Sequence, residues 1–363
     1  MAGSGGPSST WHPASFSASS QSADPASLGV VATIPVGSHP ISATYDSANG
    51  YVYVVNQYSD NVSVINGTSV VGTFRAGFGP VVAVYDSENG YVYVGELGCE
   101  GCGSAIVGIV RGTSVIANVS VGVQAEYVAY DEVYDSGNGY VYVFNSGSTN
   151  VTVLNGTSVL GTIPLPSSGF SAGTYDSASG YVYLGTSGPD YGGGTGIVGV
   201  ISGTSYLTTL PVDIPVTSLV YDPGNGDVYA VNSNSTEVIR GLAVSTSVSI
   251  DPGYTGLSYA TYDSHDGDLY VPGPGPIVNY PPPKLPEQFP GNVSVINGTS
   301  VVTKLRVGND PTFAVYDSRT QEVYVTDLAS HAVWVINGTS LVAMVPVGLG
   351  PLFATSDPGN GYV

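Results

Sequence analysis

Charged side chains are scarce in this 363-residue chain. Asp, Glu, Lys and Arg together make up 9% of the residues, against about 25% in an ordinary soluble domain. A mainly helical protein is not expected, because the solvated faces of helices need Glu, Lys and Arg. Only seven residues are Lys or Arg and the net charge is −20, which argues against nucleic acid as a partner. No apolar run approaches the roughly 18 residues of a membrane span, so no direct membrane insertion is expected.

Cysteine occurs only at Cys99 and Cys102, in the glycine-rich stretch 98–103. A lone Cys-x-x-Cys pair has three interpretations: a local disulfide, a redox motif or half of a zinc site. A redox motif needs a strand-to-helix context and zinc needs two more ligands. The sequence therefore favours the disulfide, and with it an oxidising, extracellular location.

The start of the chain lacks the features of a secretory signal. Residues 1–6 are Met-Ala-Gly-Ser-Gly-Gly, without a basic or long apolar segment. Residues 1–27 are rich in Ser, Ala, Gly and Pro, which is typical of a tail or linker. The folded domain is expected at 28–363.

Common catalytic signatures are also missing. The chain has no Gly-x-Ser-x-Gly, no His-Glu-x-x-His and no phosphate-binding loop, and no cofactor is expected. The spacing of Asp263, Asp266 and Asp268 resembles that of a calcium-binding loop. The stretch lacks the Glu at the twelfth position of such a loop and is also explained by an ordinary Asp-Gly turn. His39 and His331 are expected near each other on one face, without a third metal ligand.

The chain does contain a repeat of about 40 residues. One aspartate recurs through it, with spacings of 40, 49, 41, 46, 41, 54 and 40 residues. The recurring residues are Asp46, Asp86, Asp135, Asp176, Asp222, Asp263, Asp317 and Asp357. An aspartate that stands beside a turn in every unit is expected to be structural, accepting backbone hydrogen bonds within the hairpin.

Each unit predicts four short strands joined by Asn-Gly or Asp-Gly turns, the strongest short-range hairpin signal. Strands such as 51–54, Tyr-Val-Tyr-Val, carry bulk on both faces, so each sheet should be covered on both sides. Radially stacked, four-stranded antiparallel blades meet this requirement, and the sequence predicts one all-β propeller. The expected units are about 41–77, 81–122, 127–165, 170–212, 216–250, 255–307 and 312–347, with a partial unit at 352–363.

Three segments resemble the YVTN β-propeller repeat. They are Tyr-Val-Tyr-Val-Val-Asn at 51–56, Tyr-Val-Tyr-Val-Phe-Asn at 140–145 and Val-Tyr-Val-Thr-Asp at 323–327. This repeat is familiar from archaeal surface-layer proteins and other secreted cell-surface proteins, so the resemblance implies a propeller at a cell surface. The final Asn is often replaced, as by Glu96, Thr186, Gly273 and Asp327, and is not expected to be a shared ligand.

The sequence is compatible with either seven or eight blades. Seven complete units lie between residues 41 and 347, with one outer-strand match at 30–36 and two inner-strand matches at 352–363. An eighth blade that combines both ends of the chain is slightly favoured by this strand count. The family resemblance favours seven.

Three units carry insertions between their second and third strands, at 97–104, 187–194 and 272–291. All three are expected on the ring face that also holds the loops between blades, which is a common way to build a binding surface. The longest contains a proline-rich candidate interaction loop, Tyr280, Pro281, Pro282, Pro283 and Lys284.

Nine Asn-x-Ser/Thr sequons are glycosylation candidates if the protein is exported. They are Asn61, Asn66, Asn118, Asn150, Asn155, Asn234, Asn292, Asn297 and Asn337. Four of them belong to the Asn-Gly-Thr turn of the repeat and are explained by turn chemistry alone.

These patterns favour a non-enzymatic, extracellular propeller that acts as a structural, self-assembling or adhesive module. Its expected partners are copies of itself, other cell-surface proteins or glycans. Two alternatives remain open: a lactonase-like hydrolase or lyase with its site at the channel mouth, and a soluble carbohydrate- or peptide-binding module.

Overall fold

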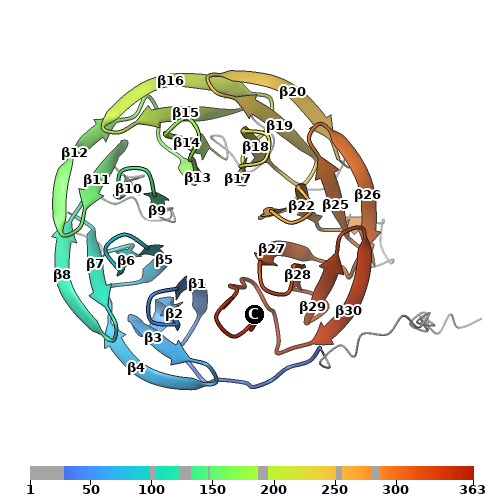
Figure 1. The fold of residues 1–363 in the computed structure, drawn as a ribbon, viewed down its shortest axis with the longest axis horizontal. Coiled ribbons are helices and arrows are strands. Elements are labelled where there is room, and N and C mark those ends of the chain that lie inside the picture. The colour runs from blue at the N-terminus through green and yellow to red at the C-terminus, as the bar shows by residue number, and fades with distance from the viewer. Residues whose placement is uncertain are drawn as a thin grey trace, which may run out of the picture.

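The structure is a computed structural model that describes residues 28–98, 104–122, 132–145, 148–186, 195–250, 256–275, 277–278 and 287–363. It is a ring of four-stranded antiparallel sheets whose first strands face the centre and whose fourth strands form the rim (Figure 1). The all-β propeller prediction is confirmed. One short 3-10 helix, Gln57–Ser59, is the helical element of the described residues, and none of these residues forms a helix long and apolar enough to span a membrane.

The strands follow the ring in sequence order. Blade 1 is β1 (Pro40–Asp46), β2 (Tyr51–Asn56), β3 (Asn61–Asn66) and β4 (Ser69–Arg75). Blade 2 is β5 (Pro80–Asp86), β6 (Tyr91–Glu96), β7 (Ile106–Arg111) and β8 (Ser114–Ser120). Blade 3 is β9 (Glu132–Asp135), β10 (Tyr140–Asn145), β11 (Asn150–Asn155) and β12 (Ser158–Pro164). Blade 4 is β13 (Phe170–Asp176), β14 (Tyr181–Thr186), β15 (Gly196–Ser202) and β16 (Ser205–Val212).

The remaining three blades keep this order. Blade 5 is β17 (Ser218–Asp222), β18 (Asp227–Val231), β19 (Ser235–Arg240) and β20 (Ala243–Ser249). Blade 6 is β21 (Thr261–Asp263), β22 (Asp268–Gly273), β25 (Asn292–Asn297) and β26 (Ser300–Arg306), with the small pair β23 (Ile277–Val278) and β24 (Glu287–Gln288) in its insertion. Blade 7 is β27 (Pro311–Asp317), β28 (Glu322–Asp327), β29 (Ala332–Asn337) and β30 (Ser340–Pro346).

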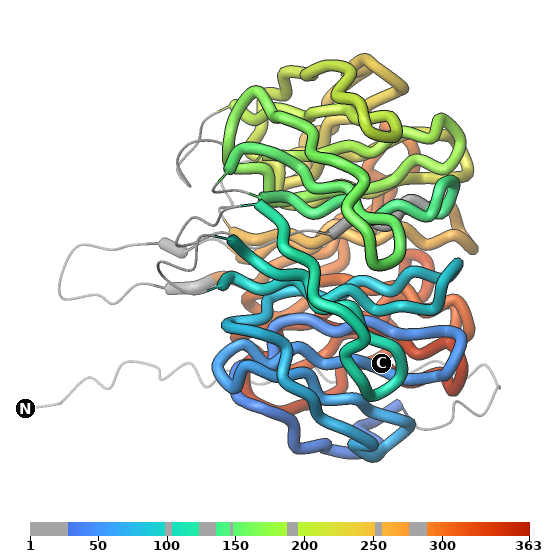
Figure 2. The backbone as a smooth tube through the Cα atoms, turned by 90° about the vertical axis from the view of Figure 1, so that its left-hand side faces the viewer, coloured from blue at the N-terminus to red at the C-terminus, as the bar shows by residue number. Residues whose placement is uncertain are grey.

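The strands run between two faces of the ring, which Figure 2 shows edge-on. One face, called the loop face below, carries both the loops between second and third strands and the linkers between blades. Backbone hydrogen bonds join these two kinds of segment: the Ala76 amide donates to the Asp60 carbonyl at 3.1 Å, and the Leu97 amide to the Gly79 carbonyl at 3.0 Å. The opposite face carries the tight hairpins.

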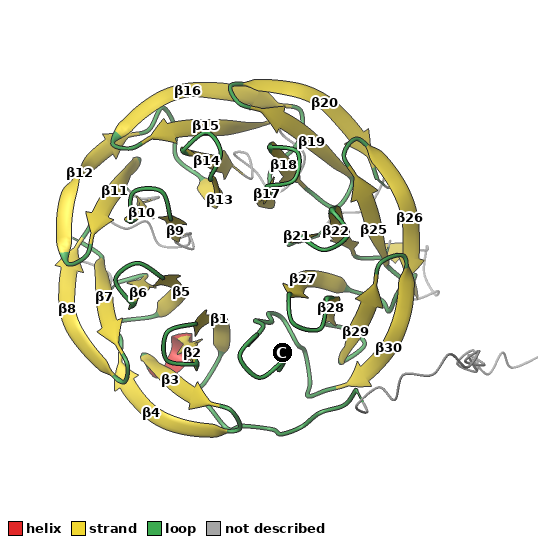
Figure 3. Cartoon of the chain, in the orientation of Figure 1, coloured by secondary structure: helices red, strands yellow, loops and turns green. Residues whose placement is uncertain are grey.

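The slightly favoured count of eight blades is wrong, and the seven-blade alternative is observed. The partial C-terminal unit contributes only an isolated bridge between Asp357 and Tyr362. Residues 28–36 run along the rim without forming a strand. In Figure 3 both segments are drawn as loop between blade 7 and blade 1. Because the described residues include no second and third strand at this place, neither segment has a described neighbour whose backbone would complete a ladder.

The recurring aspartates lie in the first hairpin of each blade. The Asp46 Oδ1 atom accepts the Ala48 amide at 2.9 Å, and Gly50, at φ 75°, closes the turn onto the Asp46 carbonyl. The same carboxylate-to-amide bond occurs at Asp86, Asp176, Asp222, Asp263, Asp317 and Asp357. The side chain of Asp135 lies outside the described residues. Most of these aspartates also meet the tyrosine of the next blade, as Asp176 meets the Tyr221 hydroxyl.

We expect Asp176→Ala to lower the free energy of unfolding by about 2 kcal/mol, because a buried carboxylate loses its hydrogen bonds to two amides and the Ser179 hydroxyl. Asp176→Asn keeps an acceptor oxygen and should recover part of the loss. Urea denaturation of both variants checks this. If the Ala variant, the Asn variant and the parent protein all had the same free energy of unfolding, the structural role of Asp176 would be contradicted.

Six apolar clusters join the seven blades, each shared by two neighbours. A tyrosine in the second strand stands in the middle of this packing, and in blades 2, 3, 4 and 6 it donates its hydroxyl to the third-to-fourth turn of the next blade. Tyr183 in blade 4, for example, is fully buried and donates to the Gly241 carbonyl of blade 5 at 2.9 Å. The equivalent bonds join Tyr93 to Gly156, Tyr142 to Gly203 and Tyr270 to Gly338.

Candidate active site

Blade 7 places two carboxyl groups together where its innermost strand begins on the loop face. Asp327 ends β28, and Asp310 immediately precedes β27. Asp327 is fully buried. It accepts hydrogen bonds from the Asp310 amide at 3.1 Å, the Ser330 amide at 3.0 Å and the Trp334 indole nitrogen at 3.3 Å. These contacts fix the position of the carboxylate at the inner edge of the ring.

The side chain of Asp310 is half-buried. Desolvation by burial raises its pKa, and the negative charge of Asp327 raises it further. Within the described residues no side chain or amide donates a hydrogen bond to the Asp310 carboxyl. A carboxyl group with these surroundings retains its proton to a higher pH than an ordinary aspartate and keeps both oxygens available for a ligand.

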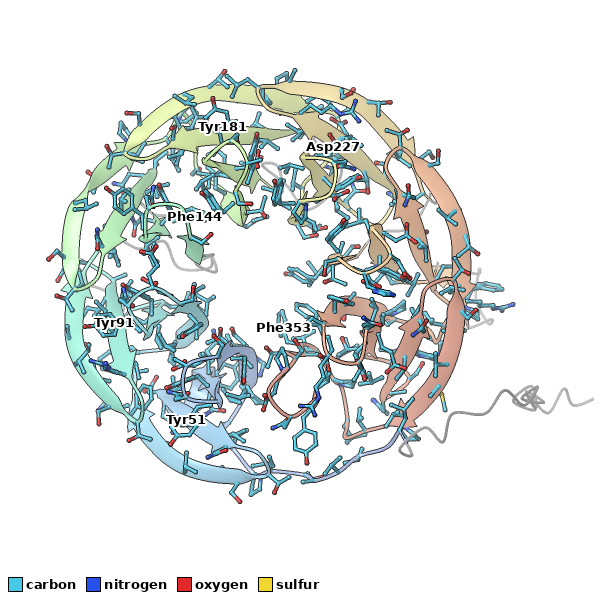
Figure 4. All side chains as sticks on the ribbon, viewed as in Figure 1. Tyr51, Tyr91, Phe144, Tyr181, Asp227 and Phe353 are labelled. Atoms are coloured by element: carbon cyan, nitrogen blue, oxygen red, sulfur yellow. The ribbon has the colours of Figure 1, made fainter. Side chains whose placement is uncertain are left out.

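Three aromatic rings meet beside the innermost strand of blade 7 and come from three different parts of the chain. Tyr259 precedes β21, Phe313 belongs to β27, and Phe353 belongs to the C-terminal segment. The ring centroids are 5.8 Å apart for Tyr259 and Phe313, 5.8 Å for Tyr259 and Phe353, and 5.2 Å for Phe313 and Phe353. Phe353 is 36% exposed and borders the centre of the ring (Figure 4). The rings form an apolar cluster on β27, the strand that Asp310 precedes.

The base of the blade 6 insertion packs against the linker that carries Asp310. The Gly275 amide donates to the Asn309 carbonyl at 3.0 Å, and the Gly291 amide donates to the Gly308 carbonyl at 2.6 Å. The two ends of the insertion thus hold the linker from one side. From the other side, Ser330 Oγ accepts the Asn309 amide at 3.1 Å. This double support makes the position of Asp310 a rigid one.

Other carboxyl groups on the loop face serve the backbone. Burial raises the pKa of Glu96, whose carboxylate accepts the Phe78 amide at 2.6 Å. Burial also raises the pKa of Glu237, which accepts the Asp213 amide at 2.8 Å. Asn145 holds the Gly122 amide of its own linker in the same way, at 3.0 Å. At the final position of the repeat motif, Glu96, Asn145 and Asp327 thus each hold the linker before their own blade. Glu237 does the same from the third strand β19, and Asp310 differs because it is an extra acid.

The metal candidates of the sequence fall in an ordinary hairpin. Asp263 accepts the amides of His265 and Asp266, and Asp268 accepts the side-chain amide of Asn297 at 2.7 Å. Among the described residues, no group of three His, Cys, Asp or Glu side chains is arranged to hold a metal ion.

The two histidines sit in separate loops on the loop face. His39 stacks on Tyr58 with centroids 4.2 Å apart, and His331 Nδ1 accepts the Gly350 amide at 3.0 Å. Each ring therefore has a structural contact of its own.

The sequons differ in exposure. Those with exposed asparagines are Asn66, Asn118, Asn155, Asn297 and Asn337, and those with half-buried asparagines are Asn61, Asn150, Asn234 and Asn292. Cys99, Cys102 and the candidate interaction loop 280–284 lie outside the described residues.

Asp310 was not among the candidates that the sequence indicated. Two signals pointed to it: an Asp in place of a small residue before the linker proline Pro311, and an Asp in place of the motif Asn at Asp327. Considered alone, each of these two substitutions is indistinguishable from neutral sequence variation. Only the fold shows that the two changes meet.

No family model matches the chain, and no curated protein matches it. Several solved structures are similar to the chain in fold. Hydrazine synthase from Kuenenia stuttgartiensis has a TM-score of 0.55 and 15% identity, covering 91% of this chain and 93% of that one. The dihydro-heme d1 dehydrogenase NirN in complex with DHE has a TM-score of 0.61 and 12% identity, covering 88% and 68%.

At these identities the likeness shows the propeller fold. Both neighbours carry the names of enzymes. The expectations of a non-enzymatic adhesive module and of no enzymatic activity are corrected accordingly, and the enzyme alternative fits these findings better. The expectation rested on the absence of known catalytic motifs, which does not argue against a site whose residues are separated along the chain.

Proposed function

We propose that this protein is a hydrolase that uses Asp310 as a general acid at the inner edge of the loop face. The observation that supports this most is the pairing of a half-buried carboxyl, without a hydrogen-bond donor among the described residues, with the fully buried Asp327. Pairs of titratable groups in unlike environments are how proteins keep one carboxyl protonated and available as an acid.

The reaction class we propose is the hydrolysis of an ester or lactone. Water adds to the carbonyl carbon of the substrate and forms a tetrahedral intermediate. As the C–O bond of this intermediate breaks, the Asp310 carboxyl gives its proton to the leaving oxygen, and the proton lost from the added water then restores the carboxyl. The products are one acid and one alcohol, or one hydroxy acid from a lactone. Asp327 positions Asp310 through the backbone amide of that residue and keeps its proton in place by charge.

The substrate we propose is uncharged and has an apolar part. A chain with a net charge of −20 and carboxyl groups at this edge repels anions. The surface formed by Tyr259, Phe313 and Phe353 offers aromatic contact to an apolar or ring-shaped substrate. This favours a neutral lactone or ester over an acidic polysaccharide.

An extracellular location is part of the proposal. It is supported by the uncharged polar composition, the resemblance to the YVTN-type repeat of secreted and cell-surface proteins, and five exposed sequons. Glycans or other surface proteins are the partners this location would offer. Mass spectrometry of material from the native source tests the location through attached glycans and the state of Cys99 and Cys102.

A substrate panel tests the function. It contains five- and six-membered lactones, p-nitrophenyl acetate and butyrate, and an anionic uronate polymer, with proton release as the readout. We expect turnover of neutral substrates that Asp310→Asn removes and that Asp213→Asn, an acid in the linker between blades 4 and 5, leaves unchanged. If neither neutral class is turned over, or if Asp310→Asn retains full activity, the proposal fails.

A binding module is the second candidate, favoured by the same three aromatic rings. Rings at a rigid inner edge also suit stacking against a sugar. Saturable binding of a neutral oligosaccharide by the parent protein, lost in Phe353→Ala and without any turnover, would support this candidate instead.

A further inference from the structure

The last residue of the second strand has a common role in blades 1 and 3. In blade 1, Asn56 ends β2, and its side-chain Nδ2 donates to Asn61 Oδ1 at 2.9 Å and to Ser63 Oγ at 3.0 Å. The equivalent bonds of blade 3, both of 2.8 Å, join Asn145 to Asn150 and Thr152. In both blades a side-chain amide is therefore the donor, and two side chains of the third strand are its acceptors.

Blade 7 differs from this arrangement at all three positions. Asp327 ends β28, and the strand pairing places Ala332 and Trp334 where blade 1 has Asn61 and Ser63. An ionised aspartate has no hydrogen to donate, alanine has no side-chain acceptor, and the indole nitrogen is a donor only. The direction of hydrogen bonding is thus reversed, because an acceptor at the end of the second strand faces a donor on the third.

Each printed partner of the Asp327 carboxyl is a donor. Oδ1 accepts the backbone amides of Asp310 and Ser330, and Oδ2 accepts the indole Nε1 of Trp334 at 3.3 Å. Gly308 packs on the same Oδ2 so closely that a Cβ at this position would overlap with it. None of the three bonding groups could accept the O–H of a protonated Asp327. The arrangement therefore suits the carboxylate form.

The indole of Trp334 is held in place by the packing between blades 6 and 7. Its ring packs against the apolar cluster that contains Tyr270, Val295 and Val323. The strand that carries it, β29, is paired on both sides, with β28 and β30. Because this packing already fixes the side chain, the N–H needs little further ordering to meet Asp327.

The charge of Asp327 acts on its neighbour Asp310. Within the described ranges no ion pair joins a cation to either carboxyl. His331 is close in the sequence, but its Nδ1 accepts the Gly350 amide. Burial and the negative charge of Asp327 together raise the pKa of Asp310. The position of the proton in this pair therefore depends on the groups that hold Asp327 ionised.

We propose that Trp334 is a positioning residue for the general acid: its indole N–H holds Asp327 as the anion, and this anion keeps the proton of the pair on Asp310. The catalytic meaning of this role rests on the proposed function, whereas the location of the proton rests on the hydrogen bonds. A buried charge requires a donor, and a bond to a charged acceptor is among the stronger ones. Ala332 contributes by the absence of an oxygen that would repel the carboxylate.

A titration of the carboxyl carbons in the whole ¹³C-aspartate-labelled protein tests this without a substrate, with Asp310→Asn and Asp327→Asn to assign the signals. Trp334→Phe keeps an aromatic ring but has no N–H. We expect the midpoint of Asp327 to rise by about one pH unit, because a lost hydrogen bond to a charged group changes the equilibrium roughly tenfold. The gap between the midpoints of Asp327 and Asp310 should narrow accordingly.

Thr326→Val is the matched control. It removes a buried hydroxyl from the residue before Asp327, and this hydroxyl bonds to the carbonyls of Phe313 and Leu352 instead of to the carboxyl pair. Both midpoints should stay where they are in the parent protein.

An isosteric replacement covers the case in which the smaller phenyl ring disturbs the packing. Benzothienylalanine has the shape of tryptophan, with sulfur in place of the N–H. It can be incorporated at position 334 in a Trp11→Phe background, because Trp11 is the only other tryptophan of the sequence. The same rise in the midpoint of Asp327 is expected.

The outcomes distinguish the role of Trp334 from the proposed function. Unchanged midpoints of Asp327 and Asp310 in both Trp334 variants overturn this role, whatever the activity. An equal rise in Thr326→Val would be a general effect of packing and would overturn it as well. A protein that titrates as expected but turns over no lactone or ester keeps the placement of the proton and loses only the hydrolase function.

Discussion

Asp310→Asn is expected to lower kcat/KM for a neutral lactone or ester by about 10²–10⁴-fold, the usual contribution of a positioned general acid. Asparagine keeps the shape of the side chain but has no proton of comparable acidity. The variant should fold normally. Asp310 has a raised pKa when folded, so the stability it supports is present at low pH and is lost as the pH rises through that value. At neutral pH an uncharged side chain should therefore be at least as stable.

The pH profile distinguishes an acid from a residue that only shapes the site. The parent kcat/KM should fall as the pH rises through the raised pKa of Asp310, because the proton-bearing form is the active one. Asp327→Asn removes the neighbouring charge and should move this fall to lower pH. Asp213→Asn is the matched control and should leave the profile in place. A profile that is flat across the range in the parent protein would contradict a role for Asp310 as an acid.

Tyr183→Ala is expected to lower the free energy of unfolding by about 3–5 kcal/mol, the range for removal of a large buried side chain. Tyr183 has no exposed surface, and its hydroxyl joins blade 4 to blade 5 through the Gly241 carbonyl. Burial raises the pKa of this phenol to about 12, so it stays a hydrogen-bond donor throughout the working range of pH. Tyr183→Phe keeps the ring and should cost only about 1 kcal/mol.

Guanidinium denaturation of the Ala and Phe variants measures both effects. Tyr58→Ala is the control, because Tyr58 is 74% exposed and lies outside the packing between blades. Its change should stay within about 0.5 kcal/mol. A loss of similar size for Tyr183→Ala and Tyr58→Ala would mean that the contacts between blades do not carry the stability of the ring.

The fold could be predicted from the sequence because the same turn and strand motifs recur in several units of the chain. Each Asp-x-x-Asn-Gly stretch specifies a hairpin, and each Tyr-Val-Tyr-Val strand requires cover on both faces, so repetition leaves a ring as the solution. The number of complete blades was harder. Segments 30–36 and 352–363 match the strand patterns, but a pattern becomes a strand only when a neighbour pairs with it, and the described chain supplies none.

The candidate site could not be predicted in the same way. Repetition makes unique residues stand out, yet Asp310 and Asp327 are each only one substitution away from the repeat. Their effect arises from proximity: the linker before β27 turns back onto the end of β28, and burial then acts on both carboxyl groups. The aromatic rings Tyr259, Phe313 and Phe353 come from three segments that the ring closure brings together. The spacing of residues along the chain predicts neither the proximity of Asp310 and Asp327 nor the meeting of the three rings.

The central claim is that Asp310 carries a proton where an ordinary aspartate has lost it. An NMR titration of the carboxyl carbons in ¹³C-aspartate-labelled protein measures this directly, with Asp310→Asn to assign the signal and Asp327→Asn to remove the neighbouring charge. We predict that Asp310 titrates above the ordinary value of about 3.9 and that its midpoint falls when Asp327 is replaced. A midpoint at or below the ordinary value in the parent protein would contradict the account.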